Sequence, residues 1–122
     1  MTVASNLDLR QHLNADLNRL QGDELVATAG GGQGVGPRLK VGMNRFTIVV
    51  TAGDSAQLPS MTDREIDGHV IVINDTANSM NVFPATGESM NTVVNAAAAV
   101  AANSAAFFML QRSLANWRSA TL

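Results

Sequence analysis

The sequence predicts a mainly β protein: a small antiparallel β-sandwich or barrel-like module with an N-terminal helix or arm. Residues 70–73 form an unbroken β-branched run that stops at Asn74-Asp75-Thr76, whose side chains favour turns. Residues 45–51 alternate with a period of two, which is typical of a half-buried strand. Glycine, proline and asparagine separate these runs, so the strands are expected to be short.

The composition bounds the size of the core and the kind of partner. The chain has 122 residues, the size of one domain. Hydrophobic residues make up 46% of it but aromatic residues only 4%, so we expect a core of small and β-branched side chains. Such a core buries little area per residue, which favours help from neighbouring subunits. A net charge of −2, with 15% charged residues, argues against a nucleic-acid partner.

The absence of cysteine leaves the redox compartment open, while the apolar runs bear on secretion and membrane insertion. The chain has no cysteine, which excludes disulfides and thiolate metal sites. The N-terminus has an early aspartate and no apolar stretch of signal-peptide length. Asn95 and Asn103 interrupt the alanine-rich stretch, so no apolar run reaches the roughly 18 residues that cross a bilayer. We therefore expect a soluble protein made in a cytoplasm, with no membrane partner.

The first 36 residues are predicted to form an arm, and residues 37–122 the sandwich. Within residues 5–21 the leucines follow a helical spacing and would form one apolar face, and Gly22 stands where such a helix would end. This face either packs on the chain's own core or docks on a partner or sister subunit, and an extended arm is the remaining alternative. The leucines concerned are Leu9, Leu13, Leu17 and Leu20.

A glycine-rich segment at residues 30–37 follows the helix. Bare backbone N–H groups in such a segment can approach a phosphate closely. No Lys-Ser or Lys-Thr follows as in a P-loop, Val35 stands where the last glycine of a dinucleotide motif belongs, and Pro37 removes a donor. We interpret the segment as a flexible link or surface loop.

The strands of the module are expected in chain order. A short strand over residues 23–29 precedes the glycines, a half-buried strand ends near Val50, and a short edge-like strand ends at Pro59. Residues 60–67 read as a connection, and residues 70–83 as a hairpin that leads into a loop at Pro84. Residues 95–114 read equally as one long helix, by propensity, or as two strands joined by a turn at residues 102–104.

The polar residues give no sign of catalysis. The two histidines, His12 and His69, have no third ligand at metal spacing, and Arg64 interrupts the carboxylates of residues 63–67. No nucleophile, base and orienting group gather in one stretch, so we expect no enzyme activity, cofactor, metal or small-molecule substrate. Trp117 either caps one end of the core or anchors a subunit interface.

A resemblance decides between helix and strands at the C-terminal end. Residues 72–91, reading VINDTANSMNVFPATGESMN, resemble a pattern of tailed-phage virion proteins: a strand ending in Asn-x-Thr, then Val-x-Pro-x-x-Gly, then a small-residue strand, an aromatic-bearing strand and a terminal Asn-Trp. The residues at the matching places are Asn74, Asn81, Val82, Pro84, Gly87, Met90, Asn91, Phe107, Asn116 and Trp117. Met90 replaces the usual isoleucine, and Asn103-Ser104 stands where a glycine turn is common.

This resemblance implies a β-sandwich of phage head decoration (cement) proteins, which is shared with tail-fibre and spike segments. It implies a structural virion protein, commonly a homotrimer, located on the outer capsid surface. Such a protein binds the major capsid protein of an assembled shell and stabilises the shell by bridging capsomers. The alternative that the resemblance leaves open is a tail-fibre or spike module that recognises a host surface receptor. Neither role brings a catalytic residue with it.

Overall fold

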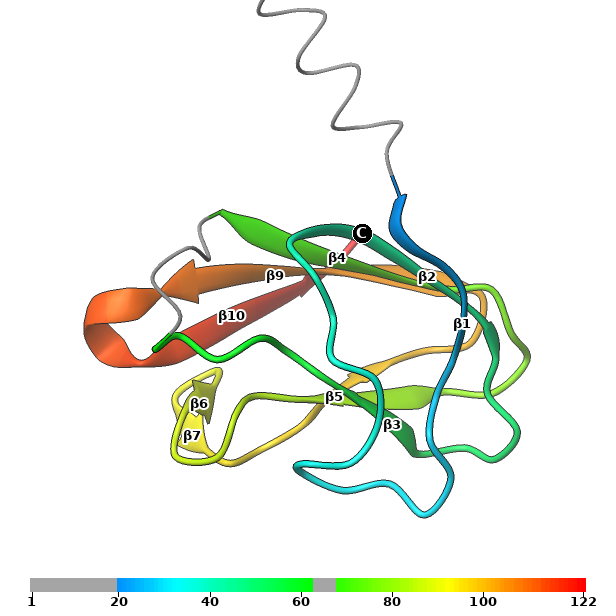
Figure 1. The fold of residues 1–122 in the computed structure, drawn as a ribbon, viewed down its shortest axis with the longest axis horizontal. Helices are drawn as coiled ribbons and strands as arrows, with labels where there is room; N and C mark the ends of the chain where they lie inside the picture. Colours follow the sequence, from blue (N-terminus) through cyan, green and yellow to red (C-terminus); the bar gives the residue numbers. More distant parts are fainter. Residues whose placement is uncertain (1–19, 63–67) are drawn as a thin grey trace, which may run out of the picture.

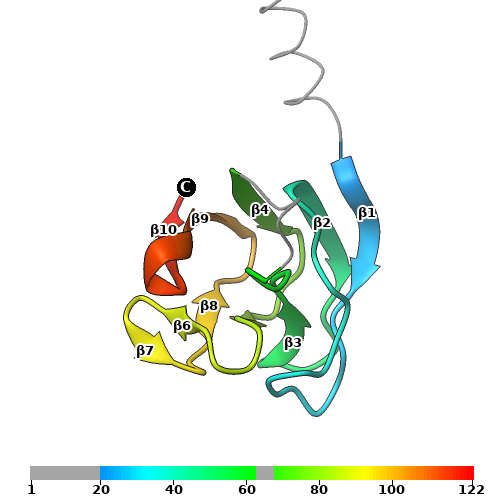
Figure 2. The same ribbon diagram turned by 60° about the vertical axis from the view of Figure 1, so that its left-hand side comes forward.

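The computed structural model describes residues 20–62 and 68–122, which form two β-sheets packed face to face (Figures 1 and 2). The larger sheet has the order β1 (Leu20–Val26), β2 (Gly42–Ile48), β4 (His69–Asn74), β9 (Ser104–Gln111), β10 (Asn116–Thr121), β6 (Ser89–Met90) and β7 (Val93–Val94). The smaller sheet has the order β3 (Asp54–Gln57), β5 (Met80–Phe83) and β8 (Ala98–Val100). A short 3-10 helix, η1 (Arg112–Leu114), joins β9 to β10.

The predicted mainly β sandwich is confirmed, and the pairing within its sheets is mixed. From β2 to β5 the chain alternates between the two sheets, and each crossing reverses its direction. Strands two apart in sequence therefore become parallel neighbours, as in the β2–β4 and β3–β5 pairs. Antiparallel pairs join β4 to β9, β9 to β10, and β5 to β8. A strictly antiparallel sandwich is thus replaced by one with parallel ladders.

The hairpin predicted over residues 70–83 is wrong, although both of its strands are present. β4 belongs to the larger sheet and β5 to the smaller one, so the segment between them is an arch that crosses the sandwich. The buried Asn74 side chain ends β4 and binds the backbone of the arch at Asn78. Turn-forming residues end a strand in the same way whether the chain pairs with itself or crosses to another sheet.

Residues 95–114 form strands, as the resemblance implies, and not a helix. β8 and β9 are joined through Ala101–Asn103, and Asn103 has a φ of 53°. Asparagine tolerates this left-handed conformation better than other non-glycine residues, so it supplies the turn where glycine is common. In this alanine-rich stretch Ala97 and Ala99 are exposed, whereas Ala96 and Ala98 pack against the core and Val100 lies within it.

The boundary predicted between residues 36 and 37 is wrong, because the sandwich begins at Leu20. β1 pairs in parallel with β2, and Ala27 is buried in the core. The helix predicted over residues 5–21 is likewise wrong at its end, since Leu20 and Gln21 belong to β1; the rest of that range lies outside the described residues. Leu20 pairs with Met43, and a ladder partner outweighs local helix propensity.

The glycine-rich segment is a loop packed along the edge of β3, and not a flexible link. The Thr28 N–H donates to the Ser55 carbonyl at 3.0 Å, and the Ser55 hydroxyl donates to the Val35 carbonyl at 2.9 Å. Gly36 has a φ of 107°, and a Cβ there would overlap the Ser55 carbonyl oxygen. Glycine is required at this position because the backbones approach so closely.

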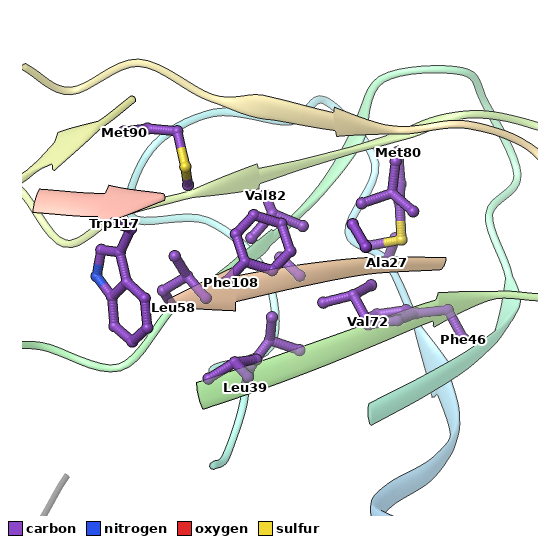
Figure 3. Packing of buried hydrophobic residues seen from close by; sticks show 14 of the residues in the cluster. Ala27, Leu39, Phe46, Leu58, Val72, Met80, Val82, Met90, Phe108 and Trp117 are labelled. Atoms are coloured by element: carbon purple, nitrogen blue, oxygen red, sulfur yellow. The ribbon is translucent and has the colours of Figure 1, made fainter. Parts of the chain in front are cut away.

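The core lies between the sheets and contains more large side chains than the composition suggested (Figure 3). Trp117, Phe46 and Phe108 are its largest fully buried members, each with no exposed area. Leucines and methionines fill the space between them, and valines and alanines complete the set. The other buried apolar residues are Ala27, Leu39, Val49, Ala56, Leu58, Met61, Val70, Val72, Met80, Val82, Met90, Val100 and Ala106.

Candidate assembly surface

The buried polar side chains of the described residues hold turns and strand ends together. The Asn44 amide donates to the carbonyls of Lys40, Gly42 and Ile71, and its oxygen accepts from the Lys40 N–H. Asn116 accepts from the Thr92 N–H at 2.9 Å and donates to Gln111 at 2.7 Å. Because backbone groups use these amides, the amides are not directed toward a ligand.

Glu88 is the buried carboxylate at the end of the sandwich that holds Trp117. One of its oxygens, Oε2, accepts from the Met61 N–H at 2.8 Å and from the Ser60 hydroxyl at 3.3 Å. Its other oxygen, Oε1, and the Trp117 indole N–H have no hydrogen-bond partner within the described structure. This carboxylate fixes the loop at Ser60 and Met61, which is a structural role.

Three charged groups form a small network, which joins three strands of the larger sheet. Arg45 on β2 lies 2.8 Å from the Asp23 carboxylate of β1 and 2.7 Å from the Asp75 carboxylate that follows β4. The hydrogen bond from Arg45 lowers the pKa of Asp23 below its usual value, and the same bond raises the pKa of Arg45. No three His, Asp or Glu side chains of the described ranges come close enough to hold a metal.

The feature without a structural explanation is the apolar outer face of the larger sheet. Side chains alternate along each strand, and Val70, Val72 and Phe108 point into the core. Their neighbours therefore point outward, away from the smaller sheet. We define the outer face by the apolar residues at these positions on β2, β4, β9 and β10: Met43, Ile71, Ile73, Ala105, Phe107, Met109 and Ala120.

The strand register places these residues in adjoining rows. The central row crosses four strands, since Met43 pairs with Ile71, Ile71 with Phe107, and Phe107 with Ala120. His69 stacks on Phe107 with ring centroids 4.8 Å apart, and Met109 is 49% exposed. The four strands contain no Lys, Asp or Glu, but Arg45 and Arg118 lie on this same face, paired with Ile73 and Met109. A sheet face that meets water normally carries polar residues, so this face has the composition of a covered one.

A second apolar group lies at the end of the sandwich formed by β6, β7 and η1 (Figure 1). Val93 and Val94 are 57% and 59% exposed on β7, and Leu114 is 67% exposed in η1. The two residues between β6 and β7, Asn91 and Thr92, both have positive φ, as in a tight type I′ hairpin turn. The short hairpin therefore presents its valines on a rigid support.

Of the residues that the sequence nominated for assembly, the structure describes Leu20 and Trp117. Trp117 lies inside the core (Figure 3), and a side chain with no exposed area cannot anchor a subunit contact in this conformation. Leu20 begins β1, where its backbone pairs with Met43. Leu9, Leu13 and Leu17, and the carboxylates of residues 63–67, lie outside the described residues.

Sequence reasoning missed the outer face. The available signal was that residues 70–73 on β4 and residues 105–109 on β9 are apolar at both odd and even positions. A strand with one face in water alternates, whereas a strand covered on both faces is apolar throughout. The run was interpreted only as evidence of a buried strand.

Neither a protein-family model, nor a curated protein, nor a solved structure matches this chain. Within residues 20–62 and 68–122, no helix has the length and apolar character needed to cross a bilayer. The surface chemistry and the sequence resemblance are therefore the grounds on which a function is proposed.

Proposed function

We propose that this chain is a structural virion protein of a tailed phage. It binds the outer surface of the assembled capsid as a homotrimer, contacts the major capsid protein and bridges neighbouring capsomers. The observation that carries the proposal is the outer face, an apolar surface on four strands that other protein must cover. The resemblance of residues 72–91 to phage virion modules and the two-sheet fold support the same conclusion.

The proposed shell contact is the end that carries Val93, Val94 and Leu114. Val93 and Val94 on the hairpin and Leu114 in η1 are all more than half exposed, and the outer face is left free for contacts between copies. Each contact is small, but a trimer engages several capsomers at once, so its contacts act together. A ligand that binds only the assembled shell shifts the equilibrium toward assembly by mass action.

The test is co-sedimentation of the purified chain with shells of the phage that encodes it. We expect the chain to pellet with assembled shells and to stay in solution with unassembled capsid protein. It should also raise the temperature at which the shells disassemble. Pelleting with neither form, or an unchanged disassembly temperature at saturating protein, would refute the proposed function.

A pair of matched variants tests the shell contact. Val94→Asp places a charge in the proposed contact, and Val50→Asp places the same charge at a 70% exposed valine in the segment between β2 and β3. We expect Val94→Asp to weaken shell binding at least about tenfold, which corresponds to about 1.4 kcal/mol. Val50→Asp should bind like the parent. Equal binding by the two variants would remove this end of the sandwich from the interface.

A further inference from the structure

We infer that the outer faces of two copies of this chain pack against each other about a two-fold axis, with Arg118 of each copy beside the Asp23 and Asp75 carboxylates of the other. The inference deepens the proposed function and rests on its proposal that copies assemble. A two-fold contact joins copies in pairs, so on a shell it links copies that belong to neighbouring trimers.

One corner of the outer face carries an excess negative charge. Arg45 on β2 is shared by two carboxylates, that of Asp23 at 2.8 Å and that of Asp75 at 2.7 Å. One guanidinium group between two carboxylates leaves one negative charge uncompensated. Arg45 binds one oxygen of each carboxylate, and the second oxygen of each can accept a further donor.

The opposite corner carries an uncompensated positive charge. Arg118 is exposed on β10, and its Nε donates to the amide oxygen of Gln111 at 3.3 Å. Within residues 20–62 and 68–122, Arg118 forms no ion pair with a carboxylate. Its remaining N–H groups are therefore available to an acidic partner, which a guanidinium group binds with two parallel hydrogen bonds.

The strand register gives the face a square outline. Its four strands extend over about 14 Å at about 4.8 Å per strand, and its three rows extend over about 14 Å at about 3.4 Å per residue. The rows contain His69, Ile71 and Ile73 of β4 in turn. Arg45 lies on β2 in the row of Ile73, and Arg118 lies on β10 in the row of His69, so the two arginines occupy opposite corners.

A two-fold axis along the other diagonal of this square exchanges the two charged corners. It makes the strands of the two copies cross at about 90°, which is one of the two arrangements in which sheets pack face to face. Because the outline is square, the rows of one copy then lie over the strands of the other. Ile71 and Phe107, which are paired in the central row, lie at the middle of the contact.

The charges distinguish this arrangement from an aligned one. With the strands of the two copies nearly parallel, Arg118 would lie over a corner that has no carboxylate. In the orthogonal arrangement it meets the group of Arg45, Asp23 and Asp75, and the four side chains together have no net charge. The Asp23 and Asp75 side chains are 49% and 48% exposed, so these ion pairs lie at the rim of the contact, where desolvation costs little. Burial of the apolar centre supplies the attraction, and the corners fix the orientation.

The first experiment measures the mass of the full chain in solution by light scattering, over a range of concentrations and without any shell. The contact is small for a specific interface, so we expect the mass to rise with concentration to that of an even number of 12.8 kDa chains. Arg118→Glu places a negative charge opposite the carboxylates and should halve this mass. Arg38→Glu, the same reversal at an exposed arginine beside β3 of the smaller sheet, is the matched control and should leave the mass unchanged.

The second experiment restores the contact by exchanging the charges. Asp75→Arg makes the excess charge of the Arg45 group positive, so this variant alone should also have half the parent mass. When it is mixed with Arg118→Glu, opposite charges meet at both corners of a pair that contains one chain of each kind. We expect the mixture to regain the parent mass, and a tag on one of the variants shows the composition of the pairs.

Three results would overturn the inference. They are a parent chain that has the mass of one copy at every concentration up to its solubility limit, a mass that Arg118→Glu leaves unchanged, and a mixture that stays at half the parent mass. Circular dichroism and the emission of the buried Trp117 show whether each variant has kept its fold. A chain that passes these tests but does not pellet with shells would refute the proposed function alone, and a chain that pellets with shells but fails these tests would refute the two-fold contact alone.

Discussion

Replacing Asn74 with alanine removes the side chain that links the β4–β5 arch to the β8–β9 turn at one end of the sandwich. Its amide donates to the carbonyls of Asn78 at 2.9 Å and of Val100 and Ala101 at 3.2 Å. Its oxygen accepts from the Thr76 N–H at 3.2 Å and the Thr76 hydroxyl at 2.7 Å. The side chain has no exposed area and joins the β4–β5 arch to the β8–β9 turn.

The expected loss in the free energy of unfolding follows from the number of these hydrogen bonds. Each hydrogen bond contributes about 1 kcal/mol net, so three donated and two accepted bonds set an upper value of about 5 kcal/mol. Only the bond to the Val100 carbonyl is fully buried, and the partly buried groups regain water in the variant. We therefore expect Asn74→Ala to lower the free energy of unfolding by about 3 kcal/mol.

Urea unfolding followed by tryptophan fluorescence measures this change. Trp117 is the one tryptophan in the chain and is fully buried, so its emission reports exposure of the core. With a slope of about 2 kcal/mol per molar urea, the midpoint should fall by about 1.5 M. Asp75→Asn, a change at the exposed neighbouring residue, is the control and should leave the midpoint nearly unchanged. Equal midpoints for the two variants would refute the reasoning.

Two further predictions concern the glycine loop and the charged network. Gly36→Ala should destabilise the fold by about 2 kcal/mol or more, because Gly36 has a φ of 107° and a Cβ there meets the Ser55 carbonyl oxygen. Gly32→Ala, where a Cβ meets nothing within 4 Å, should be tolerated, and urea midpoints compare the two. Arg45→Met should return the lowered pKa of Asp23 toward its ordinary value, as followed by NMR of the carboxyl carbon. Because that pKa is lower in the folded state, the bond stabilises the fold above the unfolded-state pKa and is lost as the pH falls through the folded one. An Asp23 titration that Arg45→Met leaves unchanged would contradict this assignment.

Local pattern predicted most strands but not which sheet each one joins. The runs ending at Ile48, Asn74 and Phe83 were found from β-branched residues and turn signals, which act over a few positions. The arch at Asn74 depends on the carbonyls of Val100 and Ala101, which follow it by 26 and 27 residues. No local signal contains that information, so a hairpin and an arch have the same sequence pattern.

The misplaced boundary at the N-terminal side has a similar cause. Glycine clusters commonly mark flexible links or surface loops, and this one was interpreted as one of the two. In the structure Gly36 is required because the loop lies against the backbone of β3, where a Cβ on Gly36 would meet the Ser55 carbonyl. A loop that packs closely against another backbone and a flexible link are both rich in glycine. Only the position of the partner strand shows which of the two is present.

Trp117 and the outer face show how the candidate surface was partly visible in the sequence. A lone tryptophan is the obvious candidate for an interface, yet a core with few aromatic residues needs it inside, and it is fully buried. The large apolar residues that remain for contact with another chain are less conspicuous: two methionines, two isoleucines and Phe107 at alternate positions of three strands.

The continuous apolar runs of β4 and β9 therefore contain two sets of alternate residues, one on each face of the sheet. One set of alternate residues, such as Val70 and Phe108, satisfies the sandwich core, and the sandwich gives no use to the other set. A sheet that required only its inner face would tolerate polar residues at Ile71 and Phe107 at no cost to the core. That those positions are apolar is consistent with the proposal that another protein surface covers the outer face.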